Sequence, residues 1–244
     1  MRKVIGVGET VLDIVFKHEQ PMGALPGGSV FNTIVSLGRV GADATFISAV
    51  GNDRVGANVI SFLKDNGVHA DYVTKYAEGQ TPISLAFLNE QNDADYLFYH
   101  DNKQHSPDFT YPDVQPDDIV IFGSFYAVSA ATRPQVVSFL EFAHSRGAII
   151  YYDVNFRPSH QNEVMKITPN LIENLEYADI VRGSHEDFKV LYKQDNPDKV
   201  YKSEISFYCR KLIYTCGAAP VELRADGGLA KSYPIAPTST VSTI

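Results

Sequence analysis

The chain has 244 residues, a formal net charge of −8 and 44% hydrophobic residues, so it is long and apolar enough to bury a full core. The acidic balance argues against a general nucleic-acid surface, although a local phosphate site can still be built from backbone N–H groups. No apolar run approaches the roughly 20 residues of a membrane span, and the N-terminus lacks the apolar stretch of a secretory signal. We therefore expect a cytoplasmic protein.

Short apolar runs alternate with segments of helical period, which is typical of an α/β fold with a mainly parallel sheet. In chain order, we predict strands at 4–7, 45–49, 119–122 and 148–152, a short strand ending at 181, a strand at 211–215, and a closing hairpin of 221–223 with 231–233. The predicted helices cover 30–37, 55–63 and 133–144, and a further helix starts at Ser184.

Two stretches, 13–16 and 72–99, indicate strands with few intervening helices. In the second, Ile83, Leu85 and Phe87 alternate with other side chains at the period of a strand. We predict that these strands form a small sheet outside the main one, where it could cover a cleft as a lid.

The segment from Pro26 to Asn32 contains Gly27-Gly28 followed by Ser29. Two glycines allow close approach of a ligand and positive φ angles, and Ser29 is a good N-cap for the predicted helix. Backbone donors and the Asn32 amide could hold a polyol there, or the segment could be a tight loop before an ordinary capped helix.

Other polar residues carry alternative interpretations. Asp13 lies between Leu12 and Ile14, where it could bind sugar hydroxyls or face solvent on an alternating strand. Gly6-Val7-Gly8 is not a dinucleotide fingerprint, because that motif requires a third glycine where this chain has Val11. The Asn-Asp turn within 51–56 is more often structural. Cys209 and Cys216 are expected to be bystander thiols.

The order of these motifs resembles that of the ribokinase-like (PfkB) carbohydrate kinases. Gly27-Gly28 with Asn32 and then Gly51-x-Asp53-x-x-Gly56 are similar to the N-terminal signature of that family. The segment 153–158, Asp-Val-Asn-Phe-Arg-Pro, is similar to fructokinases and 2-keto-3-deoxygluconate kinases. The resemblance continues at 182–186, where the family has Asn-x-x-Glu, and at Thr215-Cys216-Gly217.

The resemblance implies a single kinase domain over 1–244, a three-layer α/β/α fold with a β-sheet lid from about 12–18 and 70–100. It implies that Asp13, Gly27, Gly28 and Asn32 bind the sugar, and that Arg157 acts on the substrate or the transferring phosphate. It also implies that Asn155, Glu186, Thr215 and Gly217 bind ATP, with Glu186 serving Mg²⁺ through water. We expect Asp13, Asn32 and Arg157 to surround one cavity.

The chain departs from the family pattern at its end. The resemblance implies a Gly-Ala-Gly-Asp segment that supplies the anion hole and the catalytic base, but the chain stops at Ile244, directly after a Thr-rich lead-in at 239–244. The printed chain could omit C-terminal residues of the protein, the protein could be truncated and inactive, or a degenerate kinase fold could serve as a sugar- or nucleotide-binding module. Gly183, Pro220 and Tyr99-His100 also differ from common family residues.

From the resemblance we expect ATP-dependent phosphorylation of a small sugar, with fructose favoured and a 2-keto-3-deoxy sugar acid or ribose next. Lid closure would exclude water. Because lid strands expose edges, a homodimer that pairs them is a further hypothesis.

Overall fold

The computed structural model describes residues 2–76, 78–90, 94–99 and 109–236 of the chain. It contains two compact units, Lys3–Pro112 and Asp113–Pro237. The predicted lead-in at 239–244 and the His100 position lie outside the described residues. No helix within the described ranges is both long and apolar enough to cross a membrane.

The first unit contains a parallel sheet and two helices. Its elements are β1 (Lys3–Val7), α1 (Ser29–Arg39), β4 (Asp43–Gly51), α2 (Arg54–Asp65), β5 (Val68–His69) and β6 (Val73–Tyr76). Strand β4 pairs in parallel with β1, β5 and β6. The core is aromatic where α1 meets the sheet, since Phe31 and Phe46 are both fully buried and make an edge-on contact with 5.7 Å between ring centroids.

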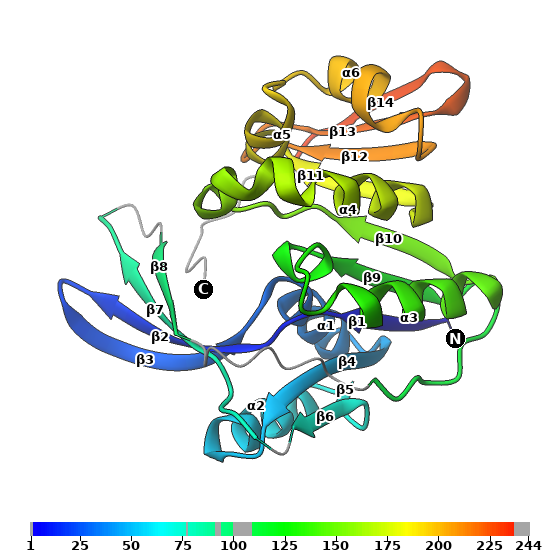
Figure 1. Ribbon diagram of the computed structural model, residues 1–244. Coiled ribbons are helices and arrows are strands. Elements are labelled where there is room, and N and C mark those ends of the chain that lie inside the picture. Colours follow the sequence, from blue (N-terminus) through cyan, green and yellow to red (C-terminus); the bar gives the residue numbers. More distant parts are fainter. Residues whose placement is uncertain (1, 77, 91–93, 100–108, 237–244) are drawn as a thin grey trace. The chain divides into compact units, whose positions relative to one another are not determined.

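A second sheet of the first unit is antiparallel except for one pair. It consists of β2 (Val11–Lys17), β3 (Gln20–Gly27), β7 (Ile83–Leu88) and β8 (Ala94–Tyr99), in the order β3-β2-β7-β8 (Figure 1). We call it the lid sheet. Strands β2, β7 and β8 lie in the predicted lid regions, whereas β6 pairs with β4 in the parallel sheet. The β3 strand was not predicted from the sequence.

The second unit is built around a six-stranded sheet. Its strands are β9 (Ile119–Gly123), β10 (Ile149–Asp153), β11 (Ile180–Ser184), β12 (Lys211–Thr215), β13 (Val221–Ala225) and β14 (Leu229–Tyr233). Strands β9 to β12 are parallel neighbours in chain order, and β13 and β14 continue the sheet as the predicted antiparallel hairpin.

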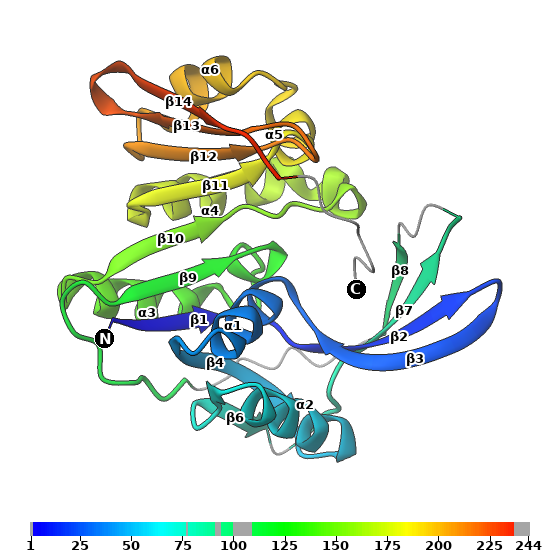
Figure 2. The ribbon, with the colours of Figure 1, turned by 180° about the vertical axis from the view of Figure 1, so that it is seen from behind.

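The helices of the second unit cover one face of this sheet (Figures 1 and 2). They are α3 (Arg133–Ser145), α4 (Val164–Tyr177), α5 (His185–Tyr192) and the short α6 (Pro197–Val200). Strand side chains on the covered face, such as Ile150, Tyr152 and Tyr214, are almost completely buried. On the other face, Tyr151, Asp153 and other side chains are half-buried, so polar groups remain accessible there.

Three further features of the helices and strands differ from the predictions. Helix α4 was not predicted, because Pro169 lies inside it and proline ordinarily ends a helical pattern. Strand β11 begins at Ile180 and extends to Ser184, rather than ending at 181. The N-cap of α1 is Gly28, with no side-chain cap, and Ser29 is the first helical residue. The α/β fold class is confirmed.

Candidate active site

The two glycines before α1 are required for different reasons. Gly28 has φ 137°, and a side chain there would place its Cβ 2.5 Å from the Glu9 carbonyl oxygen. A Cβ at Gly27 would collide with the Asp13 carboxylate. Because Gly28 supplies no capping side chain, the first N–H groups of α1 are suited to donate hydrogen bonds to a ligand oxygen. Asn32 lies exposed one turn into this helix.

The Asp13 carboxylate is buried at the base of the lid sheet. Asp13 is only 7% exposed, and the hydroxyl group of Ser84 on β7 donates a hydrogen bond to Asp13 Oδ1. The structure therefore brings Asp13, Gly27 and Gly28 together at the point where β2, β3 and α1 meet. A carboxylate is a good acceptor for sugar hydroxyls.

Strand register assigns the neighbours of Asp13 to one face of the lid sheet. Asp13 pairs with Ser84, and Ser84 pairs with Phe98 on β8. Because side chains alternate along a strand, Tyr96 and Phe98 share this face, whereas Leu97 and Tyr99 lie on the opposite one. The Tyr96 and Phe98 rings are stacked, with centroids 5.7 Å apart. A carboxylate and a hydroxyl beside an aromatic surface suit a sugar ring.

The Gly51–Gly56 segment has a structural role, as its turn chemistry indicated. Asp53 is the N-cap of α2 and accepts a 2.7 Å hydrogen bond from the Gly56 N–H. It also accepts hydrogen bonds from the Thr81 N–H, at 2.7 Å, and the Thr81 hydroxyl, at 2.9 Å. Burial opposes the charged form, but these hydrogen bonds lower the pKa of Asp53 below its ordinary value. Asp53 thus fastens α2 to the residue that leads into β7.

In the second unit, polar side chains gather at the carboxyl ends of three adjacent strands. Asp153 ends β10, Arg182 lies on β11 and Thr215 ends β12. Arg182 donates one hydrogen bond to Asp153 Oδ1, at 2.9 Å, and another to Thr215 Oγ1, at 3.0 Å. Burial raises the pKa of Asp153, and the charge and hydrogen bond of Arg182 partly offset that increase. Ligands of open α/β sheets bind at this edge.

The segment after β10 turns sharply. Asn155 has φ 34°, a left-handed conformation that asparagine tolerates better than most residues. The Phe156 N–H donates to Asp187 Oδ1 at 2.7 Å, which attaches the segment to the start of α5. Arg157 follows as an exposed residue before a 3-10 helix at Pro158–Glu163. Arg157 thus lies four residues beyond the end of β10, and its contact with a phosphate stays a prediction.

The first turn of α5 contains two carboxylates, Glu186 and Asp187, which have different surroundings. Asp187 is buried and forms a capping box with Ser184, so its oxygens serve the protein backbone. Glu186 is exposed. Among the described residues, no group of three or more His, Cys, Asp or Glu is arranged to hold a metal ion. The role of Glu186 as an outer carboxylate for Mg²⁺ stays a prediction.

Gly217 lies in the turn between β12 and β13. Its φ is 52°, and a Cβ there would meet nothing within 4 Å, so the backbone is open on that side. The Ala219 N–H closes the turn on the Cys216 carbonyl at 2.9 Å. An open glycine turn at the end of a parallel strand is suited to contact a nucleotide.

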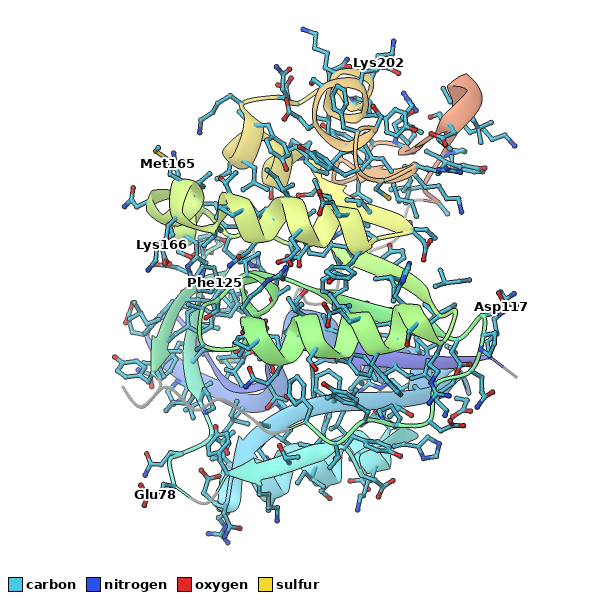
Figure 3. All side chains as sticks on the ribbon, turned by 45° about the vertical axis from the view of Figure 1, so that its right-hand side comes forward. Glu78, Asp117, Phe125, Met165, Lys166 and Lys202 are labelled. Atoms are coloured by element: carbon cyan, nitrogen blue, oxygen red, sulfur yellow. The ribbon has the colours of Figure 1, made fainter. Side chains whose placement is uncertain are left out.

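Sequence reasoning did not find two residues that shape the loops at this edge. Phe125 follows β9, and its ring stacks on His160 with 3.8 Å between centroids. Figure 3 shows Phe125, with Met165 and Lys166 nearby, on the side of the second unit opposite Asp117. Neither residue belongs to a local motif. The contact becomes visible only when the pairing of β9 with β10 brings the segments after these two strands together.

The fold and the polar strand ends define an α/β protein of the kind that binds small ligands at the carboxyl edge of its sheets. The model of the pfkB family of carbohydrate kinases matches residues 1–244, and the chain belongs to this family. Both of its cysteines are free thiols.

Curated relatives carry kinase names. A 5-dehydro-2-deoxygluconokinase of Bacillus thuringiensis (strain Al Hakam) is 27% identical over 220 residues, which are 84% of this chain and 62% of the relative. A probable chloroplastic fructokinase-6 of Arabidopsis thaliana is 25% identical over 70% of this chain and 46% of its own length. The chain thus spans less than two thirds of these relatives.

Solved structures share the fold. Fructokinase from Vibrio cholerae O395, solved with fructose, ADP and calcium ion, matches with a TM-score of 0.85 at 18% identity, over 100% of this chain and 79% of that one. Aminoimidazole riboside kinase from Salmonella enterica, solved with aminoimidazole riboside and an ATP analog, matches with a TM-score of 0.82 at 21% identity. The match covers 98% of this chain and 79% of that one. The ribokinase-like fold is therefore confirmed. The roles assigned to individual site residues, and the shared cavity of Asp13, Asn32 and Arg157, stay predictions.

Proposed function

We propose that the protein transfers the γ-phosphate of ATP to a hydroxyl group of a small sugar. Fructose is the first candidate, because segment 153–158 resembles fructokinases and a curated relative is named as one. A keto sugar acid is the next, since other relatives are named 5-dehydro-2-deoxygluconokinase, and ribose follows. A cytoplasmic location belongs to the same proposal.

The observation that carries the proposal is the Asp13 site. Gly27 and Gly28 bring the backbone against a buried carboxylate, and Ser84 holds that carboxylate in place. A carboxylate of this kind can accept hydrogen bonds from two sugar hydroxyls, and the start of α1 and Asn32 can donate others. The geometry suits a neutral polyol better than a second anion, because Asp13 would repel a carboxylate placed beside it.

The strand ends of the second unit supply groups suited to a nucleotide. Phosphoryl transfer depends mainly on positioning and charge neutralisation. Arg157 offers an exposed cation, while Thr215 and the Gly217 turn offer a hydroxyl and open backbone. ATP supplies the phosphoryl group, and Mg²⁺ would neutralise its charge with Glu186 and Asn155 nearby.

The test is a panel assay of the full-length protein with ATP and Mg²⁺. Fructose, ribose and keto sugar acids are offered separately, and phosphorylated product is detected by ³¹P NMR. We expect one sugar to give product with a kcat/KM well above the others. If no sugar gives product, the kinase proposal is wrong. Sugar binding without turnover would favour a binding module instead.

A further inference from the structure

We propose that Arg182 is a positioning residue for the nucleotide, which it serves by fastening together the carboxyl ends of β10, β11 and β12. The inference rests on the proposed function and adds a residue to it. It begins from the two hydrogen bonds of the guanidinium group, which reach one side chain on each flanking strand.

The strand register makes this bridge possible. Asp153 is the direct neighbour of Arg182 on β10, and Thr215 is the neighbour of Ser184 on β12. Because Arg182 and Ser184 are two residues apart on β11, all of these side chains lie on one face of the sheet. A planar guanidinium has donors on two sides, so it can span three strands where an ammonium group cannot.

The loop that follows β10 is attached to β11 and α5 beside the bridge. The Arg182 carbonyl accepts a 2.9 Å hydrogen bond from the Val154 N–H. The Phe156 N–H is held by Asp187, five residues beyond Arg182. Asn155 and Arg157 alternate with these two anchored residues, so their positions depend on how β10 sits against β11.

The charge of Arg182 is already matched. Its side chain is 29% exposed and that of Asp153 is 18% exposed, at an N–O distance of 2.9 Å. Removing the guanidinium would leave a buried carboxylate without its counter-ion, which is costly. Since this ion pair is nearly neutral, we assign Arg182 to positioning and leave direct phosphate contact to the exposed Arg157.

The second hydrogen bond orients the Thr215 hydroxyl. That oxygen accepts a hydrogen bond from Arg182 at 3.0 Å. Its own proton faces the Gly183 carbonyl oxygen at a long 3.5 Å. A hydroxyl that accepts from a cation is polarised to donate, and a phosphate oxygen is a strong acceptor. The Gly217 turn begins two residues later, so the bridge from Arg182 to Asp153 and Thr215, which we call the clamp, fixes the groups assigned to the nucleotide.

The test compares Arg182→Met and Arg182→Lys with a matched control, Arg224→Met. Arg224 lies in the same unit, its side chain is 11% exposed, and it pairs with Asp198 at 2.8 Å and Glu222 at 2.9 Å. We measure the Kd for ADP by calorimetry, the KM for ATP, the KM for the sugar and the melting temperature of the full-length proteins.

We expect Arg182→Met to raise the ADP Kd and the ATP KM at least about tenfold while the sugar KM stays within about twofold, as for a lost charge-assisted contact. Arg182→Lys should recover only part of the loss. Arg224→Met should lower the melting temperature without changing either nucleotide constant.

The proposal is overturned by an unchanged ADP Kd in Arg182→Met, by an equal loss for ATP and sugar, or by the same loss in Arg224→Met. Failure of wild type to bind ADP also overturns it. If wild type binds ADP but phosphorylates no sugar, the proposed function is wrong. The ADP Kd of the variants still tests whether the clamp positions the nucleotide-binding groups.

Discussion

At the scale of single residues, neighbouring side chains of the lid sheet lie on opposite faces. Phe98 and Tyr99 are adjacent on β8 and almost equally exposed, at 53% and 54%. Register places Phe98 on the Asp13 face and Tyr99 on the other. This alternation makes the two residues a matched pair for locating the sugar.

We predict that Phe98→Ala lowers kcat/KM for the sugar about tenfold, because a lost ring contact is worth roughly 1–1.5 kcal/mol. Tyr99→Ala should leave that constant within about twofold, and the KM for ATP should change in neither variant. Steady-state kinetics at varied sugar and ATP concentrations measure both constants in the two variants. Equal losses in the two variants would place the sugar elsewhere.

The residue scale is also where sequence reasoning had least power. Asp13, Gly27 and Gly28 were identified from local motifs, and the structure explains why both glycines are needed. The clamp could not be identified in the same way, because the partners of Arg182 are 29 and 33 residues away along the chain. Contacts of this separation depend on strand register, which one sequence does not define.

At the scale of elements, the start of α1 depends on a conformation that only glycine adopts readily. We predict that Gly28→Ala destabilises the protein by about 1–3 kcal/mol, because its φ of 137° is strained for alanine and the Cβ would press on Glu9. Urea unfolding measures this difference.

Gly23 is the control, since a Cβ there meets nothing within 4 Å and its φ is not positive. Gly23→Ala on β3 should change stability by less than about 0.5 kcal/mol. Equal destabilisation by the two substitutions would show that the conformation of Gly28 is not the reason for the glycine.

Most elements were predictable because apolar periodicity is a local property. Two of those that were missed, α4 and β3, contain residues that usually break such patterns. Helix α4 includes Pro169 but buries Ile167, Leu171 and Leu175 against the sheet, and this tertiary packing outweighs the proline. Strand β3 includes Pro21, and its pairing with β2 holds it in the sheet.

At the scale of the whole molecule, the lid sheet ends in strands whose outer edges have no pairing partner among the described residues. We propose that two copies pair through β8, where Leu97 is 50% exposed on the face away from Asp13. Leu97→Lys should then shift the protein toward monomer in sedimentation experiments, because a charge disfavours edge pairing.

Ala230→Lys provides the comparison for the dimer. Ala230 lies on β14, another exposed edge strand, and in the other unit. This variant should keep the wild-type mass. A monomeric wild type at micromolar concentration, or an unchanged mass for Leu97→Lys, would contradict pairing through β8.

The most direct test of the account is the kinetic effect of Asp13→Asn on the full-length protein. The substitution keeps the size of the side chain but removes the charge that accepts sugar hydroxyls. We predict that kcat/KM for the sugar falls about 30-fold or more, as for loss of charged hydrogen bonds worth roughly 2–3 kcal/mol, while the KM for ATP stays within about twofold. An unchanged kcat/KM for the sugar would contradict the central claim that this buried lid carboxylate holds the substrate.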